Sequence, residues 1–261
     1  MDLNLKGKRA LVCGSTQGIG KACALELALL GASVTLMARD ESKLKTTLNE
    51  LSAVAGQWHD YLVADFTFPD EVKKKIEHYT REHDVAVLVN NTGGPPAGDA
   101  FDALPQDFIN AFSSHLLCNH VLTQSVVPGM KRNGYGRIIN IISTSVKIPI
   151  RGLGVSNTIR GAVANWSKTL SLELAAFGIT VNNILPGSTK TARIDFVIQS
   201  QAQKSGKSSE EIRTKMIAEI PAGRMAEASE VAAVVAFLAT PAAGYLNGVN
   251  IPVDGGRTGS L

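Results

Sequence analysis

The sequence has little cysteine and little net charge. Three of its 261 residues are cysteine, and Cys13, Cys23 and Cys118 are too widely spaced for a C-x-x-C type of metal site. We expect them to be reduced, mostly buried thiols, and we expect no metal. The net charge is +3, with Lys and Arg interspersed among Asp and Glu. The chain therefore lacks the basic stripe that a nucleic acid or an anionic membrane would require.

Long apolar runs are also absent. No apolar stretch is long enough to cross a bilayer, and the opening MDLNLKGKRALVCGS lacks the parts of a secretory signal. We therefore expect a cytoplasmic protein. Apolar residues still make up 44% of the chain and charged residues 19%, which is enough for a substantial core. We expect a single domain over residues 1–261.

Short β-branched or aliphatic runs recur along the chain and predict about seven buried strands. Segments with helical spacing lie between them, such as the stripe of Val163, Trp166 and Leu170. This alternation predicts a doubly wound α/β fold, a parallel sheet with helices on both faces and ligands at the carboxyl ends of its strands. The predicted strands are Arg9–Cys13, Ser33–Ala38, Trp58–Ala64, Val85–Asn90, Arg137–Ile142, Thr180–Leu185 and Gly248–Val253.

Local signals mark two helix starts and one long insertion. Asp40 is suited to cap the helix that follows it, and Thr67 before Pro69 and Asp70 resembles a second cap. Residues 188–222 are long, polar and rich in Lys, Ser and Gln, with IDFVIQ and EEIRTKMIAEI as short helices. We interpret this segment as a lid over a pocket. The alternative is a surface insertion with no part in binding.

A glycine-rich turn follows the first predicted strand. The residues CGSTQGIG lead directly into the helix KACALELALLG. Glycines permit a tight turn and let backbone amides at a helix N-terminus approach a pyrophosphate. The alternative is an ordinary strand-to-helix turn that needs positive φ. The residues of this turn that we expect around a dinucleotide are Gly14, Ser15, Gln17, Gly18, Ile19 and Gly20.

Further motifs occur in order along nearly the whole chain: Asp65, Asn90-Asn91-Thr92-Gly93, Ser143 at a strand end, Pro186-Gly187 with Thr191, and PVDGG near the end. With the G-x-x-x-G-x-G turn, this series resembles the short-chain dehydrogenase/reductase family, and within it the 3-oxoacyl-(acyl-carrier-protein) reductases. The resemblance implies a Rossmann-type sheet and a nicotinamide dinucleotide. It implies that Asp65 contacts the adenine, that Asn90 and Gly93 line the cofactor cleft, and that Thr191 holds the nicotinamide amide. Asn90 or Asp65 alone could equally satisfy a turn. The other implied cofactor positions are Phe66, Asn91, Thr92, Pro186 and Gly187.

The end of the second predicted strand bears on the choice of cofactor. The sequence there is Met37-Ala38-Arg39-Asp40. An acidic residue at this point would accept the ribose hydroxyls of NAD(H), whereas Arg39 can bind the 2′-phosphate of NADP(H). We therefore expect NADP(H), with NAD(H) less favoured. The alternative for Arg39 is a solvated charge at the start of a helix.

The catalytic positions depart from the family pattern. The resemblance implies a serine, a tyrosine, a lysine four residues later and a helical asparagine. Ser143 matches the serine, although it could also cap the loop that follows. Ser156 and Arg160 stand where the tyrosine and lysine belong, and His115 stands at the asparagine. No tyrosine in the chain has a lysine four residues after it.

These replacements change what proton chemistry is available. A phenol has a pKa of about 10 and an aliphatic hydroxyl lies near water at about 15.7, so Ser156 is a poor substitute acid. Arg160 can hold a ribose and stabilise an alkoxide, but its pKa above about 12 prevents a proton relay. A histidine ordinarily titrates near neutral pH, so His115 could form a variant site with Ser143. The alternative is a packed helical histidine.

Three functions remain open at this stage. The first is an NADP(H)-dependent oxidoreductase acting on a small carbonyl or alcohol, such as a 3-oxoacyl compound. The second is an inactive dinucleotide-binding sensor or partner subunit, and the third is different chemistry on the same fold. The resemblance also implies a homodimer or homotetramer packed through two long helices, here Pro105–Arg132 and Ser156–Phe177. Val163 and Trp166 could be core or interface.

Overall fold

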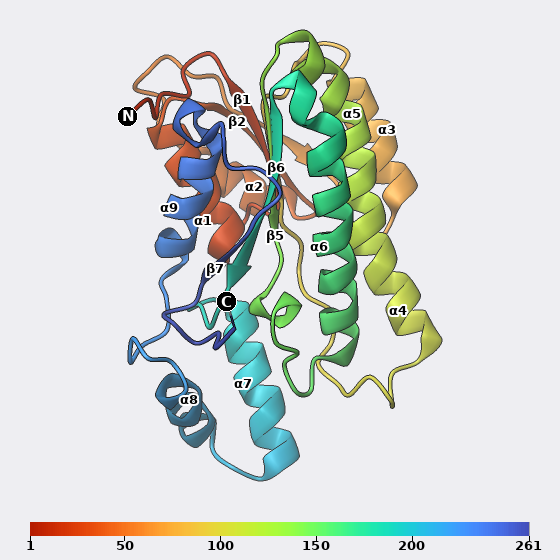
Figure 1. The fold of residues 1–261 in the computed structure, drawn as a ribbon, viewed down its shortest axis with the longest axis vertical. Helices are drawn as coiled ribbons and strands as arrows, with labels where there is room; N and C mark the ends of the chain where they lie inside the picture. Colours follow the sequence, from red (N-terminus) through yellow and green to blue (C-terminus); the bar gives the residue numbers. More distant parts are fainter. Residues whose placement is uncertain (261) are drawn as a thin grey trace.

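Seven parallel strands form one sheet, in the order β3-β2-β1-β4-β5-β6-β7, in the computed structural model, which describes residues 1–260 (Figure 1). The strands are β1 (Arg9–Cys13), β2 (Ser33–Ala38), β3 (Asp60–Val63), β4 (Val87–Asn90), β5 (Gly136–Ile141), β6 (Ile179–Pro186) and β7 (Asn250–Val253). The helices are α1 (Gly18–Leu29), α2 (Glu41–Leu48), α3 (Pro69–Tyr79), α4 (Pro105–Phe112), α5 (Cys118–Arg132), α6 (Gly154–Leu174), α7 (Ala192–Ser205), α8 (Ser209–Ala218) and α9 (Ala228–Ala239).

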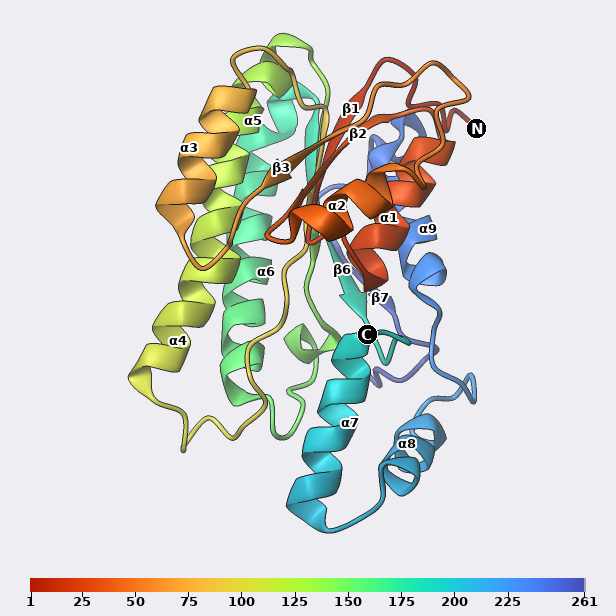
Figure 2. The same ribbon diagram turned by 180° about the vertical axis from the view of Figure 1, so that it is seen from behind.

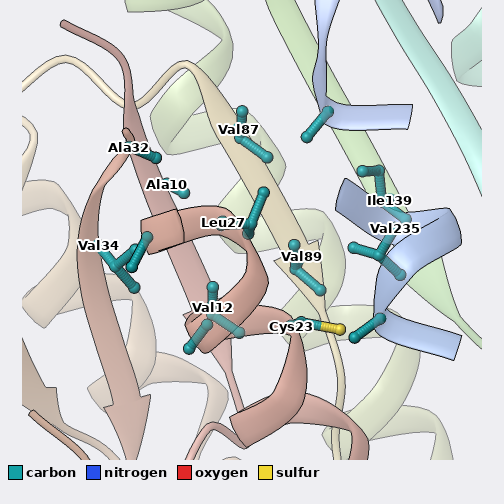
Figure 3. Packing of buried hydrophobic residues seen from close by; sticks show 14 of the residues in the cluster. Ala10, Val12, Cys23, Leu27, Ala32, Val34, Val87, Val89, Ile139 and Val235 are labelled. Carbon is teal, nitrogen blue, oxygen red and sulfur yellow. The ribbon is translucent and has the colours of Figure 1, made fainter. Parts of the chain in front are cut away.

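Helices cover both faces of this sheet, as the alternating pattern predicted. Figures 1 and 2 show α1, α2 and α9 on one face and α3, α5 and α6 on the other. Successive side chains of a strand point to opposite faces, so Val12 packs against α1 and α9 while Leu11 packs toward α3 and α5. Figure 3 shows the first of these cores, where Val12, Cys23 and Val235 meet from β1, α1 and α9.

The predicted strands are confirmed with small shifts at their ends. β1 and β2 have the predicted bounds, and β3 is the most shortened, to Asp60–Val63. The three cysteines are free and buried, as predicted. Burial raises the pKa of all three thiols, so they are poor nucleophiles.

One of the two predicted helix caps is confirmed and the other is wrong. Asp40 Oδ1 accepts a hydrogen bond from the Lys43 amide at 3.1 Å and caps α2. Thr67 does not cap α3, whose N-cap is Phe68 with no side-chain hydrogen bond. The Thr67 hydroxyl donates instead to Asp65, because that carboxylate already accepts the Thr67 amide at 2.9 Å.

The long helix predicted over Pro105–Arg132 is interrupted. A π-helical segment, Ser113–Leu117, separates α4 from α5 and carries His115 at its centre. Single π-turns inside helices are frequent at functional sites. The second long helix, predicted over Ser156–Phe177, begins two residues earlier and ends in a 3-10 turn.

Four asparagines form a ladder across the strands on the carboxyl side of the sheet. Asn90, Asn140, Asn183 and Asn250 stand in register on β4, β5, β6 and β7. Their amide groups are joined by hydrogen bonds of 2.8, 3.0 and 2.8 Å. Buried amides need partners, and each strand supplies one to the next. Asn90 is therefore a structural link between strands, with its Oδ1 left without a partner.

The insertion predicted as a lid contains the two predicted helices, of which α7 is longer than the sequence suggested and α8 is about as long. α7 and α8 project beyond the carboxyl edge of the sheet (Figure 2). They pack on each other through Ile198, Ala202 and Ile212, a small apolar cluster separate from the two main cores. No helix within residues 1–260 is long and apolar enough to cross a membrane.

Candidate active site

The glycine turn connects β1 to α1 and is held against the end of β4. Gly14 and Gly18 have φ values of +59° and +54°, which side-chain-bearing residues rarely adopt. A Cβ on Gly20 would lie 2.3 Å from the Gly14 carbonyl oxygen. Asn91 Nδ2 donates to the carbonyl oxygens of Cys13 and Gly14, at 3.2 and 3.3 Å. The three glycines are therefore required by close packing, and Asn91 fixes the turn.

The same turn leaves backbone amides available for an anion. Ser15 is buried, and its Oγ accepts the Met37 amide at 3.0 Å, so it joins the turn to β2 and does not cap α1. Gln17 is the N-cap, and its side chain caps nothing. The first-turn amides, from Gly18, Ile19 and Gly20, thus fit a pyrophosphate.

A second helix N-terminus lies directly opposite the first. Thr191, the N-cap of α7, has no capping hydrogen bond, and its Cγ2 lies 3.1 Å from where a Cβ on Gly18 would stand. β6 ends at Pro186, and the Gly187 amide donates to Val253 O at 3.0 Å. The carboxyl ends of β6 and β7 thereby place the start of α7 against the glycine turn. Two positive helix ends converge there, which favours an anionic ligand between them.

The cofactor-selecting position is open to solvent. Arg39 is exposed at the end of β2 and forms no ion pair within residues 1–260. Asp40 turns away to cap α2 and pairs with Lys43 at 3.5 Å. Hydrogen bonds from Thr67, and more weakly the charge of Arg39, hold the pKa of Asp65 below its usual value. Asp65 thus stabilises its own turn, beside Phe66, whose carbonyl oxygen accepts from Cys118 Sγ at 3.3 Å.

Ser143 lies where the resemblance implies, after the end of β5. It is half-buried, and its Oγ accepts the Ser145 amide at 3.0 Å at the start of a 3-10 turn. The turn role that the sequence left open is therefore present. Accepting this bond leaves the hydroxyl hydrogen free, so Ser143 can still donate to a carbonyl oxygen.

Ser156 and Arg160 are both buried in α6, each 8% exposed. Arg160 Nη1 donates to Ile141 O at 2.9 Å, at the end of β5. No carboxylate within residues 1–260 pairs with it, and burial, with the nearby charge of Arg193, lowers its pKa to about 10. The neighbouring Asn157 donates from Nδ2 to Ile150 O at 2.8 Å and holds the loop before α6.

His115 of the π-helical segment and Thr92 of the loop after β4 are in contact. His115 Nδ1 lies 2.5 Å from Thr92 Oγ1, and the ring is 2% exposed. Burial first, then Arg160 and Arg193, lower the pKa of His115 well below 6.5. The ring is neutral at pH 7, so it holds no imidazolium proton for a general acid. Beside it Gly93 has open space where a Cβ would stand.

Arg193 was not singled out from the sequence, yet it joins α7 to the loop after β4. It lies in the first turn of α7, and its Nη2 donates to Pro95 O at 2.6 Å in the loop after β4. Its guanidinium lies against Gly94, where a Cβ would meet three of its atoms at 3.0–3.1 Å. One local signal was available, because a cation in the first turn of a helix opposes the helix dipole.

The buried neutral state of His115 predicts an acid-sensitive fold. Below its ordinary pKa of about 6.5 the unfolded histidine binds a proton that the folded one does not, so stability is lost as the pH falls. The loss is up to about 1.4 kcal/mol per pH unit until the lowered folded pKa is reached. Urea unfolding of the wild type and His115→Gln at about pH 7.5 and about pH 5.5 measures this difference.

The wild type should lose more stability than His115→Gln between these two pH values. The control for losing a helical histidine is His120→Gln. His120 lies on α5, and its ring packs against Trp166 of α6. Equal pH dependence of the wild type and His115→Gln would show that the buried ring is not the cause.

Comparisons with known proteins agree with this geometry. A family profile described as enoyl-(acyl carrier protein) reductase matches residues 14–258. The chain is 32% identical over 253 residues to a 3-oxoacyl-(acyl-carrier-protein) reductase, FabG, of Haemophilus influenzae, covering 97% of this chain and 98% of the relative. It is also 32% identical over 257 residues to a tropinone reductase homologue of Arabidopsis thaliana, covering 98% and 91%.

Solved structures show the same architecture. L-Sorbose reductase from Gluconobacter frateurii, complexed with NADPH and L-sorbose, aligns with a TM-score of 0.92 and 28% identity over 100% of both chains. A variant of actinorhodin polyketide ketoreductase with NADPH aligns with a TM-score of 0.88 and 31% identity, covering 97% of this chain and 98% of that one.

Proposed function

Because the chain belongs to the short-chain dehydrogenase/reductase family, we propose that it transfers a hydride between NADP(H) and a carbonyl or alcohol substrate. A 3-oxoacyl-like ketone is one such substrate. The observation that carries the proposal is the pair of converging, uncapped helix N-termini at Gly18 and Thr191. The partial positive charges of two facing helix N-termini repel each other, and a bound pyrophosphate would neutralise them.

Arg39 supports NADP(H) over NAD(H). It is exposed at the end of β2, and no carboxylate of the described residues 1–260 pairs with it, since Asp40 caps α2. A guanidinium binds a phosphate through charge-assisted hydrogen bonds, and a ribose hydroxyl offers no such charge. Arg39 is therefore positioned to bind the 2′-phosphate.

Arg39→Ala is expected to weaken NADPH binding by about 10- to 100-fold, or about 1.4–2.7 kcal/mol, with little effect on NADH. Calorimetric titration of both cofactors measures this. Lys45→Ala is the matched control, since it removes an α2 cation already paired with Glu41 at 2.9 Å. An equal loss for NADPH and NADH would refute the 2′-phosphate role.

The residues at the substrate side can support reduction without the family's tyrosine. Bound NADPH would supply the hydride to the carbonyl carbon. The free hydroxyl hydrogen of Ser143 donates to the carbonyl oxygen, and the buried charge of Arg160 stabilises the alkoxide as it forms. Ser156 carries an aliphatic hydroxyl in place of a phenol, and His115 is neutral, so neither is a suitable proton donor. The proton that converts the alkoxide to the alcohol therefore comes from solvent. His115 then serves to hold Thr92.

The lid and the assembly follow from the same proposal. α7 starts against the glycine turn at Thr191, so the arm of α7 and α8 can close over a bound cofactor.

Ile109 on α4 and Leu172 on α6 are 56% and 72% exposed. Burial of such side chains favours a homodimer or homotetramer packed through these helices. Val163 is in the core. The buried free thiols suit a reducing compartment such as the cytoplasm.

A second function, a dinucleotide-binding sensor or partner subunit without turnover, is favoured by one observation. The site holds neither a phenol at residue 156 nor a charged imidazole at His115. NADPH titration followed by NADPH oxidation with a panel of ketones and a 3-oxoacyl thioester separates the two functions. Turnover that Ser143→Ala abolishes supports the enzyme. Binding without turnover of any carbonyl supports the sensor, and no binding of either cofactor refutes both.

A further inference from the structure

Two buried or half-buried arginines near the catalytic residues have no carboxylate partner in the described part of the chain. Arg160 and Arg193 each form a side-chain hydrogen bond to a backbone carbonyl, at 2.9 and 2.6 Å, and neither forms an ion pair within residues 1–260. Both charges act on His115, and Arg193 lowers the pKa of Arg160. Uncompensated buried charge is costly, so this cluster favours an anion supplied by a ligand.

Two acidic side chains of the neighbouring segments, Asp195 and Asp254, are already engaged. Asp195, two residues after Arg193 on α7, pairs with Arg213 of α8 at 2.8 Å. Asp254 accepts the backbone amides of Gly256 and Thr258, at 3.0 and 2.8 Å. These two carboxylates are thus used elsewhere, and neither of them pairs with Arg193 or Arg160.

The geometry of Arg193 suits a carboxylate. Its guanidinium lies flat against Gly94, a position where a side chain would approach it to 3.0–3.1 Å. The bond to Pro95 O uses one of its five N–H donors. The remaining donors can form the paired hydrogen bonds by which arginine binds a carboxylate.

The cofactor phosphates have other binding groups. The pyrophosphate position lies between the amides of α1 and Thr191, and the 2′-phosphate position lies at Arg39. Arg193 instead reaches the loop that follows Thr92, whose hydroxyl contacts His115. Its charge also lowers the pKa of His115 and of Arg160, so it lies beside the residues that would face the substrate.

We propose that the substrate is an oxo acid, or the corresponding hydroxy acid, and that Arg193 binds its carboxylate with Arg160 reinforcing the positive field. This inference rests on the proposed function and narrows its substrate class. Such a site would bind a substrate with a free carboxylate in preference to a neutral ketone or a thioester. Because Arg193 lies in the first turn of the lid, carboxylate binding would also hold α7 over the site.

The test compares acids with their methyl esters in binding experiments that need no turnover. The probes are pyruvate, acetoacetate and 2-oxohexanoate, each paired with its methyl ester. They are titrated by calorimetry into protein saturated with NADP⁺ and into protein without cofactor. The variants are Arg193→Gln and, as the matched control, Lys204→Gln, which removes a cation at the far end of the same helix.

For the wild type and Lys204→Gln, at least one acid should bind about tenfold or more tightly than its ester. Arg193→Gln should lose about tenfold or more of that acid affinity and keep ester and NADPH affinities within about threefold. Equal acid and ester binding, or binding of no acid, overturns the proposal. So does an Arg193→Gln variant that loses NADPH affinity instead, because the arginine would then serve a cofactor phosphate.

The outcome is separable from that of the proposed function. If no carbonyl is turned over but an acid preference depends on Arg193, the carboxylate site stands and the oxidoreductase activity fails. If NADPH does not bind, the titrations without cofactor still decide: an Arg193-dependent acid preference supports the site, and its absence refutes it. If ketones without a carboxylate are turned over and acids are not preferred, the oxidoreductase stands and the carboxylate site fails.

Discussion

Gly20→Ala is expected to abolish NADPH binding at micromolar concentrations and to destabilise the fold. The new Cβ would stand 2.3 Å from the Gly14 carbonyl oxygen and 2.5 Å from Asn91 Nδ2. Backbone atoms cannot yield to it as a flexible side chain could, so the turn must open. We expect an overpacking cost of about 1–3 kcal/mol and a loss of NADPH affinity of about 100-fold or more, equivalent to about 2.7 kcal/mol. Urea unfolding and calorimetry measure the two effects.

Gly161→Ala is the matched control for this change. Gly161 lies inside α6, and a Cβ there would meet nothing within 4 Å. Alanine is the better helix former by about 0.5–1 kcal/mol, so this variant should be slightly more stable and should bind NADPH normally. If Gly20→Ala behaved like Gly161→Ala, the close packing of the turn would not matter for cofactor binding.

Arg160→Met is expected to reduce turnover by about 10²- to 10³-fold, because it removes the charge that stabilises the alkoxide. Its effect on stability should be small or favourable. Lowering the pKa of Arg160 from its usual value to about 10 corresponds to about 3 kcal/mol against the charged side chain in the folded protein. Leaving Ile141 O without its donor costs about 1–3 kcal/mol. The two terms oppose each other, and the first is at least as large.

To test this, kcat with the best substrate and the urea unfolding midpoint are measured for both the wild type and Arg160→Met. Arg151→Met, in the loop before α6, controls for the loss of an exposed arginine nearby. A loss of more than about 2 kcal/mol of stability in Arg160→Met would mean that Arg160 mainly anchors β5 to α6. Unchanged turnover would remove Arg160 from the catalytic set.

The sequence predicts the parts of the site whose chemistry is local. The glycine turn stands between a strand and a helix, and the bounds of β1 and β2 follow from their apolar runs. Arg39 is found in the same way, because its position is counted from the end of β2. These features depend on residues that are neighbours in the chain, so they can be recognised from the sequence alone.

Other parts depend on contacts that no local pattern records. The apolar spacing across Pro105–Arg132 suits one continuous helix, and the π-helical segment that carries His115 becomes visible only when the backbone is traced. The neutral state of His115 likewise comes from burial and from two arginines distant in sequence. Arg193 contacts Pro95 across 98 positions of the chain. The only sign of this contact in the sequence is that Arg193 stands in the first turn of a helix, where a positive charge is unfavourable.

The asparagine ladder has a consequence for how the sheet assembles. A slip of one residue between β4 and β5, or between β5 and β6, would turn an amide of Asn140 or Asn183 to the opposite face and leave buried partners unpaired. Each such misalignment breaks the asparagine hydrogen bond between those two strands, so wrong registers are penalised beyond any loss of aliphatic packing. The amide hydrogens of these central strands should then be the last in the molecule to exchange with deuterated solvent. The polar row selects the one alignment that brings Ser143, Gly187 and the Asn91 turn to the same edge.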